Sequence, residues 1–356
     1  MTDGDTYLAF VGTYTDADTD GIYSLRVDAG TGDVERIDAV PGGQDPSFLA
    51  LPPDGEHLYA VNEADDGRVT AFAVDRGSGE LTRLNSVASG DAGPCHCSVD
   101  ATGRYVLVAH YVGGSVSMLP IEEDGSVGEP TSVVDHEGSS VDPDRQTAPH
   151  PHSITPGPEN RFAYVPDLGT DEVVVYELDR EAGALHPSDV GAVAVHPGAG
   201  PRHVDFHPNG RWAYLINELD STMTVFAYDA DTGGLEEIEH VSTLPAAFDG
   251  ESYTADVHVH PSGEWLYGSN RGHDSIAHFG IDPTDGRLDL VGCPSTRGEW
   301  PRNFALDPPG AHLFAENRES DDVVVFDVDE DTGGLAATGH VVEIPEPACM
   351  VFLPGE

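Results

Sequence analysis

The sequence predicts an all-β fold, a seven-bladed β-propeller with four antiparallel strands in each blade. The prediction rests on two turns that recur in phase along the chain. The first turn ends at Gly55, Gly103, Asn160, Gly210, Gly263, Gly310 and Gly355, and the second ends at Gly32, Gly79, Gly125, Gly183, Gly233, Gly286 and Gly333. A repeat of ~40–50 residues built from short strands is typical of propeller blades.

The fifth repeat shows the unit most clearly. Apolar runs at Pro201–Phe206, Trp212–Ile216 and Thr222–Tyr228 are separated by turns, and a weaker run at Leu235–Val241 follows. Short β-branched and aromatic runs between Gly, Pro, Asp and Asn clusters predict antiparallel hairpins. Since no segment keeps a period of ~3.6 residues, we expect almost no helix.

The two ends of the chain complement one another. The chain begins within a unit, at the second strand (residues 7–12), and it ends after a first strand (residues 347–352). The last strand is therefore expected to complete the first blade and close the ring, which removes open sheet edges. We predict one domain over residues 1–356, and a polar surface loop at residues 135–148 before the fourth blade.

The composition limits the partners and the surroundings of this protein. The net charge is −48, all 16 basic residues are Arg, and the acidic residues are spread over every repeat. Such a surface resembles those of proteins from salt-loaded (halophile) cytoplasms, and it argues against nucleic acid and anionic membranes as partners. No signal sequence or long apolar run is evident, and four Cys residues do not make a disulfide framework. These features favour a cytoplasmic monomer.

The candidate site lies at one mouth of the central channel. The first strand of each blade starts at this mouth and the second strand ends there, so residues at these positions converge. They include Glu63, His150, His152, Arg202, His203, Glu218, Asp256, His258, Arg271, Trp300, Arg302 and Arg318. Arg side chains on successive blades suit the capture of an oxyanion by bidentate hydrogen bonds, although they could instead balance the acidic residues nearby.

Three of these residues suit proton transfer. His152, Arg202 and Glu218 fall on the adjacent fourth and fifth blades. An imidazole near a carboxylate and a guanidinium can move a proton while the cation holds an anion. The alternative is a set of structural hydrogen bonds that fills the channel.

Metal binding is not favoured by the sequence. Cys95-His96-Cys97 resembles a ligand group, but alternate strand residues point to opposite faces and no Cys-x-x-Cys pair is present. A divalent cation held by Glu63, Glu218 and Asp256 remains an alternative. We predict neither a metal nor a cofactor.

Several segments carry a family resemblance. Val11–Thr15, His152-Ser153, Gly200–His203, Asn217–Leu219, Ala255–His258 and Asn270-Arg271 occur in order on matching blades. The chain resembles the lactonase family of seven-bladed propellers, which includes bacterial 6-phosphogluconolactonases and the fungal 3-carboxy-cis,cis-muconate lactonizing enzyme. The resemblance implies catalytic roles for His152, Arg202, Glu218 and Arg271, with Arg302 as a further Arg of the phosphogluconolactonase branch. His150 adds a second imidazole, so which of the two acts stays open.

The leading hypothesis is therefore a lactonase that hydrolyses 6-phosphoglucono-1,5-lactone, an anionic small molecule. His150, His203, Asp256, His258, Arg302, Trp300 and Glu63 are the expected substrate-binding residues, with Trp300 as a stacking wall for the sugar ring. A cycloisomerase that acts on a carboxymuconate would use the same Arg residues. A non-enzymatic binding platform is the third hypothesis, because a fold does not fix a function.

Overall fold

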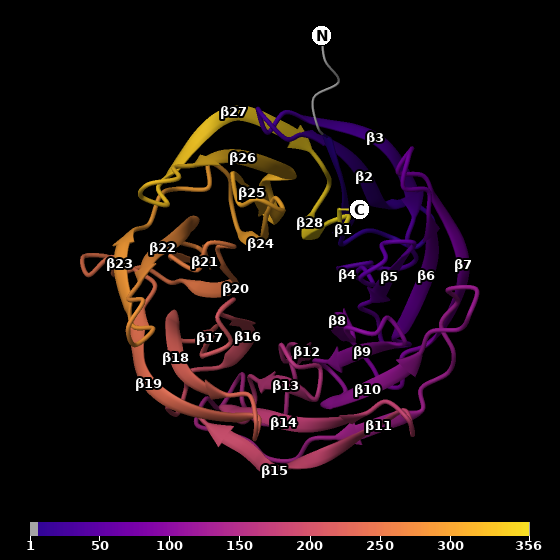
Figure 1. Cartoon of the computed structure of the whole chain (residues 1–356), viewed down its shortest axis with the longest axis horizontal. Helices are drawn as coiled ribbons and strands as arrows, with labels where there is room; N and C mark the ends of the chain where they lie inside the picture. The colour runs from indigo at the N-terminus through magenta and orange to yellow at the C-terminus, as the bar shows by residue number, and fades with distance from the viewer. Residues whose placement is uncertain (1–5, 356) are drawn as a thin grey trace.

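A computed structural model describes residues 6–355, whose strands form seven four-stranded antiparallel sheets arranged as a ring around a central axis (Figure 1). The predicted seven-bladed propeller is thus confirmed. The expectation of almost no helix also holds for these residues, where the one helical element is a 3-10 turn at Arg318–Ser320.

The blades follow one another along the chain. From its innermost strand outward, blade one consists of β28 (Pro347–Phe352), β1 (Thr6–Thr13), β2 (Asp20–Asp28) and β3 (Val34–Pro41). In the same order, blade two consists of β4 (Phe48–Ala50), β5 (His57–Asn62), β6 (Arg68–Val74) and β7 (Leu81–Ala88). Blade three consists of β8 (Pro94–Val99), β9 (Tyr105–His110), β10 (Ser115–Pro120) and β11 (Ser132–Asp135).

The remaining blades repeat this order. Blade four is β12 (Thr155–Pro156), β13 (Phe162–Asp167), β14 (Glu172–Asp179) and β15 (Ala184–Ala194), and blade five is β16 (Pro201–Phe206), β17 (Trp212–Asn217), β18 (Thr222–Asp229) and β19 (Gly234–Ser242). Blade six is β20 (Tyr253–Val259), β21 (Trp265–Arg271), β22 (Ser275–Ile281) and β23 (Leu288–Gly292), and blade seven is β24 (Pro301–Leu306), β25 (His312–Asn317), β26 (Asp322–Val328) and β27 (Leu335–Glu343).

The ring closes as the ends of the sequence predict. β28 pairs antiparallel with β1, from Ala9 opposite Phe352 to Gly12 opposite Cys349. The last strand of the chain is thereby the innermost strand of the blade that contains the first strand. This pairing satisfies the backbone groups of β1 that would otherwise form an open edge.

The second repeated turn stacks each blade on its neighbour. The hydroxyl groups of Tyr164 in β13 and Tyr214 in β17 donate to the carbonyl oxygens of Gly233 and Gly286, at 3.0 and 3.1 Å, in the outer turn of the following blade. Both glycines have a positive φ, of 76° and 79°, and a Cβ at either would meet an aromatic ring of the preceding blade. Glycine is therefore required at this turn, which explains why it recurs in phase with the first one.

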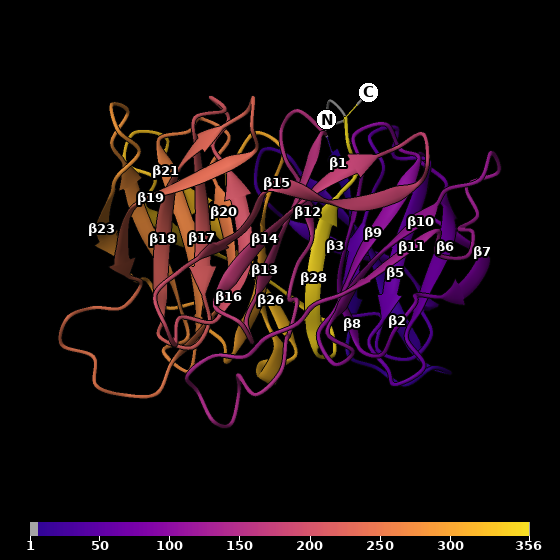
Figure 2. The same ribbon diagram turned by 90° about the horizontal axis from the view of Figure 1, so that it is seen from below.

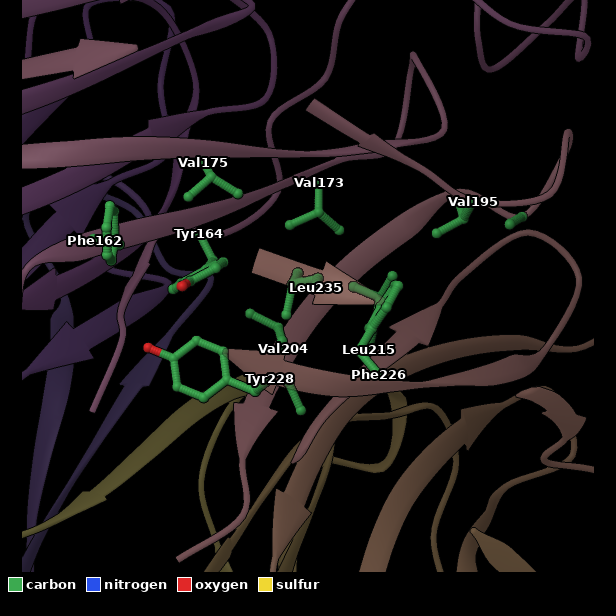
Figure 3. Close-up of a cluster of buried hydrophobic side chains, with 12 residues drawn as sticks. Phe162, Tyr164, Val173, Val175, Val195, Val204, Leu215, Phe226, Tyr228 and Leu235 are labelled. Atoms are coloured by element: carbon green, nitrogen blue, oxygen red, sulfur yellow. The ribbon is translucent and has the colours of Figure 1, made fainter. Parts of the chain in front are cut away.

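The hydrophobic core lies between the blades. Figure 3 shows the layer between blades four and five, in which Tyr164, Leu215 and Phe226 are fully buried. These side chains alternate along their strands with residues that face the opposite side of the sheet, as a sheet packed on both faces requires. Among residues 6–355, no helix has the length and apolarity needed to cross a membrane.

The positions predicted for the channel mouth lie on one face of the ring. The second strands end at the positions expected for the channel mouth, which are Thr13, Asn62, His110, Asp167, Asn217, Arg271 and Asn317. Figure 2 shows a magenta loop between β11 and β12 that projects from the lower face, where the yellow strand β28 also starts. Blade four has a short inner strand because Pro149 and Pro151 interrupt it; only an isolated bridge joins Pro151 to Asp167.

Candidate active site

Glu218 is the centre of the polar cluster at the mouth. It follows directly after β17, and its carboxylate contacts Arg271 Nη2 at 2.8 Å, Arg202 Nε at 3.1 Å and Arg145 Nη2 at 2.7 Å. Burial alone would raise the pKa of Glu218, but Arg271, Arg202 and Arg145 lower it well below the usual value of 4.5. Glu218 is therefore an anion at neutral pH and a poor proton acceptor.

The two buried guanidinium groups are fixed by the backbone of blade six. Arg202 Nη1 donates to the carbonyl oxygen of Ala255, and Arg271 Nη2 donates to that of Thr254 at 2.6 Å. Burial, together with the neighbouring Arg302 and Arg271, lowers the pKa of Arg202 to about 10, so the group stays charged at neutral pH. The Trp300 ring lies 5.5 Å from the Arg271 guanidinium and supports it by a cation–π contact.

His152 and His150 lie in different environments. His152 Nε2 is 3.9 Å from Glu218 Oε2, and burial together with the charge of Arg202 holds the pKa of His152 well below 6.5. The imidazole is neutral at physiological pH and can accept a proton. The His150 ring instead stacks on Tyr111 at 4.5 Å, and its Nδ1 donates to the Tyr111 carbonyl oxygen at 2.7 Å. This geometry favours His152 as the acting imidazole.

Arg302, in β24 of blade seven, packs against Tyr14 near Glu63. Its guanidinium lies 5.0 Å from the Tyr14 ring, and its Nη2 is 4.0 Å from Glu63 Oε2. Glu63 Oε2 accepts hydrogen bonds from Tyr14 at 2.8 Å and Ser47 at 2.6 Å. Among residues 6–355, the Arg302 side chain has no hydrogen-bond partner, so its N–H groups can donate to an oxyanion.

Three expected substrate-binding residues line a different part of the channel. Asp256 accepts hydrogen bonds from His203 Nδ1 at 2.7 Å, His258 Nε2 at 2.9 Å and Asn303 Nδ2 at 2.5 Å. These residues surround a cavity of about 240 Å³. Only His203 contacts the mouth cluster directly, because Arg202 Nη1 lies 3.1 Å from its Nε2. The arrangement links Asp256 to Arg202 through one imidazole.

Arg145 lies at the mouth although the sequence does not predict it there, whereas Tyr14 and Tyr111 directly follow the second strands β1 and β9. Arg145 reaches Glu218 from the predicted surface loop, and Tyr111 OH accepts a hydrogen bond from it at 3.1 Å. Tyr14 faces Arg302 and Glu63. Arg145 could have been noticed in the sequence as a lone basic residue within the longest interval between repeats of a very acidic chain.

The Cys95-His96-Cys97 segment does not form a ligand group. The Cys95 thiol lies 3.8 Å from His152 Nδ1, whereas the Cys97 thiol lies 3.8 Å from the Tyr59 carbonyl oxygen. The His96 ring packs between Phe48 and His203, at 4.2 and 5.3 Å between ring centres. Across residues 6–355, no three His, Cys, Asp or Glu side chains gather in a group that could hold a metal ion.

Glu316 in β25 yields a prediction about stability. It is fully buried, and within the described part of the chain neither carboxylate oxygen has a hydrogen-bond partner. Burial and the nearby Asp256 raise its pKa well above 4.5, so the folded state holds a proton that the unfolded chain releases as pH rises. We expect Glu316→Gln to raise the free energy of unfolding by ~1–3 kcal/mol at pH 8 and to change it little at pH 4.

Denaturant unfolding at the two pH values measures this effect. The exposed Glu343→Gln serves as the matched control, because it removes one carboxylate from β27, the outermost strand of the same blade. The same gain for Glu316→Gln at pH 4 and pH 8 would contradict the titration argument.

Comparison with known proteins agrees with this architecture. The family described as Lactonase, 7-bladed beta-propeller, matches residues 8–352. The chain belongs to this family. It is similar to a 6-phosphogluconolactonase of Bacillus subtilis, with 37% identity over 98% of each chain. Among solved structures it is similar to the periplasmic gluconolactonase of Pseudomonas aeruginosa, with a TM-score of 0.92, 34% identity, and coverage of 98% of this chain and 99% of that one.

A further relative extends the similarity. A 6-phosphogluconolactonase of Formosa agariphila is 34% identical over 84% of this chain and 86% of its own length. The family of seven-bladed lactonases, which the motifs around His152, Arg202, Glu218 and Arg271 suggest, is thus confirmed by comparisons that span nearly the whole chain.

Proposed function

We propose that this protein hydrolyses 6-phosphoglucono-1,5-lactone to 6-phosphogluconate. The observation that carries the proposal is a neutral, buried imidazole, His152, beside guanidinium groups that a buried carboxylate holds in place. Two relatives named 6-phosphogluconolactonase support the choice of substrate. A site that pairs a proton acceptor with fixed cations suits the addition of water to an ester carbonyl.

The reaction would proceed in two steps. His152 takes a proton from a water molecule, whose oxygen adds to the lactone carbonyl carbon and places negative charge on the carbonyl oxygen. Arg202, Arg271 and Arg302 are the available cations that stabilise this oxyanion. The bond between the carbonyl carbon and the ring oxygen then breaks, and the protonated His152 returns the proton to the ring oxygen as it leaves. The products are a carboxylic acid, which ionises, and a hydroxyl group.

In this mechanism Glu218 is a positioning residue. Its pKa, far below 4.5, leaves it without the proton affinity that a general base needs at neutral pH. Its Oε2 instead fixes the guanidinium groups of Arg202 and Arg271, while its Oε1 contacts Arg145. Such preorganised charges need no rearrangement when the oxyanion forms.

The remaining mouth residues would bind substrate. Within residues 6–355 the Arg302 guanidinium makes no hydrogen bond and has only a 4.0 Å ion pair with Glu63, and Trp300 covers Arg271, so both are suited to contact the lactone. We infer that His150 and Glu63 complete this surface, whereas His203, Asp256 and His258 act on the site through Arg202. Recognition of an anion by Arg forks fits a phosphorylated substrate.

The surroundings are a further part of the proposal. Because the net charge is −48 without any Lys, we infer that the protein works as a monomer in a salt-rich cytoplasm, where counterions screen the repulsion between carboxylates. Cell fractionation and sedimentation in molar KCl test the two inferences.

An assay of lactone hydrolysis tests the function directly. We expect purified protein in molar KCl to accelerate the loss of 6-phosphoglucono-1,5-lactone at least tenfold over buffer, with EDTA having no effect and removal of KCl lowering the rate. Unphosphorylated glucono-1,5-lactone should react more slowly. If folded protein accelerates neither lactone, the proposal is wrong, and turnover of a carboxymuconate would support the cycloisomerase instead.

A further inference from the structure

Arg145 enters the mouth from outside the blades. Residues 136–148 belong to no strand, and Figure 2 shows the loop that contains them projecting from the lower face. The side chain of Arg145 is 37% exposed, whereas those of Arg202 and Arg271 are 3% and 7% exposed. Of the three cations that contact Glu218, Arg145 is thus the one that an incoming ligand can reach first.

The backbone beneath Arg145 is fixed by its neighbour. The Gln146 side chain is fully buried, and its Oε1 accepts a hydrogen bond from Asp142 N at 3.0 Å. Its Nε2 donates to Asp171 Oδ1 at 2.7 Å and to the Leu168 carbonyl oxygen at 2.8 Å. The loop is therefore tied to blade four one residue away from Arg145.

Asp171 ties the same loop to the segment before Arg202. Its carboxylate accepts hydrogen bonds from Ser140 Oγ at 2.5 Å, Gly198 N at 2.6 Å and Gly200 N at 2.8 Å. A loop held at these points keeps its place while the long side chain of Arg145 retains freedom to move. Such a preorganised backbone with one mobile cation is suited to ligand capture.

We propose that Arg145 recognises the phosphate group of the substrate, and that it leaves Glu218 for this phosphate when the substrate binds. Its Nη2 donates to Glu218 and Tyr111, while among residues 6–355 its Nε and Nη1 make no hydrogen bond. When Arg145 moves, Glu218 keeps Arg202 and Arg271, so the buried carboxylate stays compensated. Once it has left Glu218, the Arg145 guanidinium can bind the phosphate by two hydrogen bonds, although the negative net charge of the protein repels anions.

Arg318 is less suited to this role. It is 32% exposed, but it pairs with Glu346 at 3.1 Å and with Glu319 at 3.7 Å. A phosphate near Arg318 would meet both of these surface carboxylates. The phosphate site therefore belongs on the Arg145 side of the mouth.

This inference rests on the proposed function, and the variant Arg145→Gln tests it. We expect KM for 6-phosphoglucono-1,5-lactone to rise by about 10- to 100-fold with kcat within about threefold, because charged hydrogen bonds to phosphate are lost. The constants for unphosphorylated glucono-1,5-lactone should stay within about threefold. Arg145→Lys should recover part of the loss, since it keeps the charge but not the fork.

Calorimetric binding separates this inference from the proposed function. The Kd of 6-phosphogluconate should rise by about 10- to 100-fold in Arg145→Gln, and that of gluconate should not change. Arg104→Gln, an exposed Arg in the hairpin turn between β8 and β9, is the control of equal charge. Equal losses for the phosphorylated and unphosphorylated compounds, or no loss for either, would overturn the role of Arg145, even if the protein hydrolyses no lactone.

Discussion

Replacing His152 with Asn is expected to lower kcat for lactone hydrolysis by about 10²- to 10⁴-fold, the usual contribution of a positioned general base. Asn fits the space and keeps polar atoms there, but it cannot take a proton from water. The site residues around it, Glu218 and Arg202, are held by their own contacts and should stay in place. KM should therefore change little, and steady-state kinetics of the purified variant measures both constants.

The pH profile gives a second test of the same role. The pKa of His152 lies well below 6.5 because the group is buried and close to Arg202. The neutral base thus persists as pH falls, and kcat/KM of the native protein should stay level from pH 8 to below 6.5 before it declines. His150→Asn is the matched control, because that imidazole bonds to Tyr111. A larger loss in His150→Asn than in His152→Asn would assign the proton transfer to His150.

The fold could be predicted from the sequence because the two turns report on backbone geometry. The second turn needs a residue with a positive φ and leaves no room for a Cβ beside an aromatic ring of the preceding blade. At Gly233 and Gly286 only glycine meets both needs. The mouth residues were equally predictable, since in a propeller their position follows from strand order. Glu218 and Arg271 both lie where a second strand of a blade, β17 or β21, ends.

Other parts of the site could not be predicted in this way. Arg145 lies outside the repeat, and its place depends on the burial of Gln146 against Asp171, which is a tertiary contact. The repeat also places Asp256 and Arg202 at the starts of first strands and does not distinguish their depth. Both inner strands carry a bulge, and in their registers Val204 pairs with Leu215 while Val257 pairs with Gly268. Asp256 is therefore the counterpart of His203, not of Arg202, and it lines the channel cavity with His203.

Replacing Glu218 with Gln is expected to cost both stability and activity. The side chain is buried, and its charge balances Arg202 and Arg271, which are buried beside it. Removing one partner of a buried ion pair leaves an uncompensated charge and costs ~3–5 kcal/mol in unfolding free energy. The freed guanidinium groups should also shift, and a displacement of ~1 Å at a catalytic group can lower the rate by about 10²-fold. Denaturant unfolding and kcat/KM measure the two effects.

The direction of the pH dependence distinguishes this loss from a general packing defect. Because the folded state lowers the pKa of Glu218 from 4.5, its stabilising contribution is present above pH 4.5 and is lost as pH falls further. The stability difference between the native protein and Glu218→Gln should therefore shrink in acid. Glu63→Gln, at the same mouth, is the control: this carboxylate is 23% exposed and lies 4.0 Å from Arg302. A similar penalty for both variants, unchanged by pH, would mean that the charge of Glu218 is not what fixes the Arg cluster.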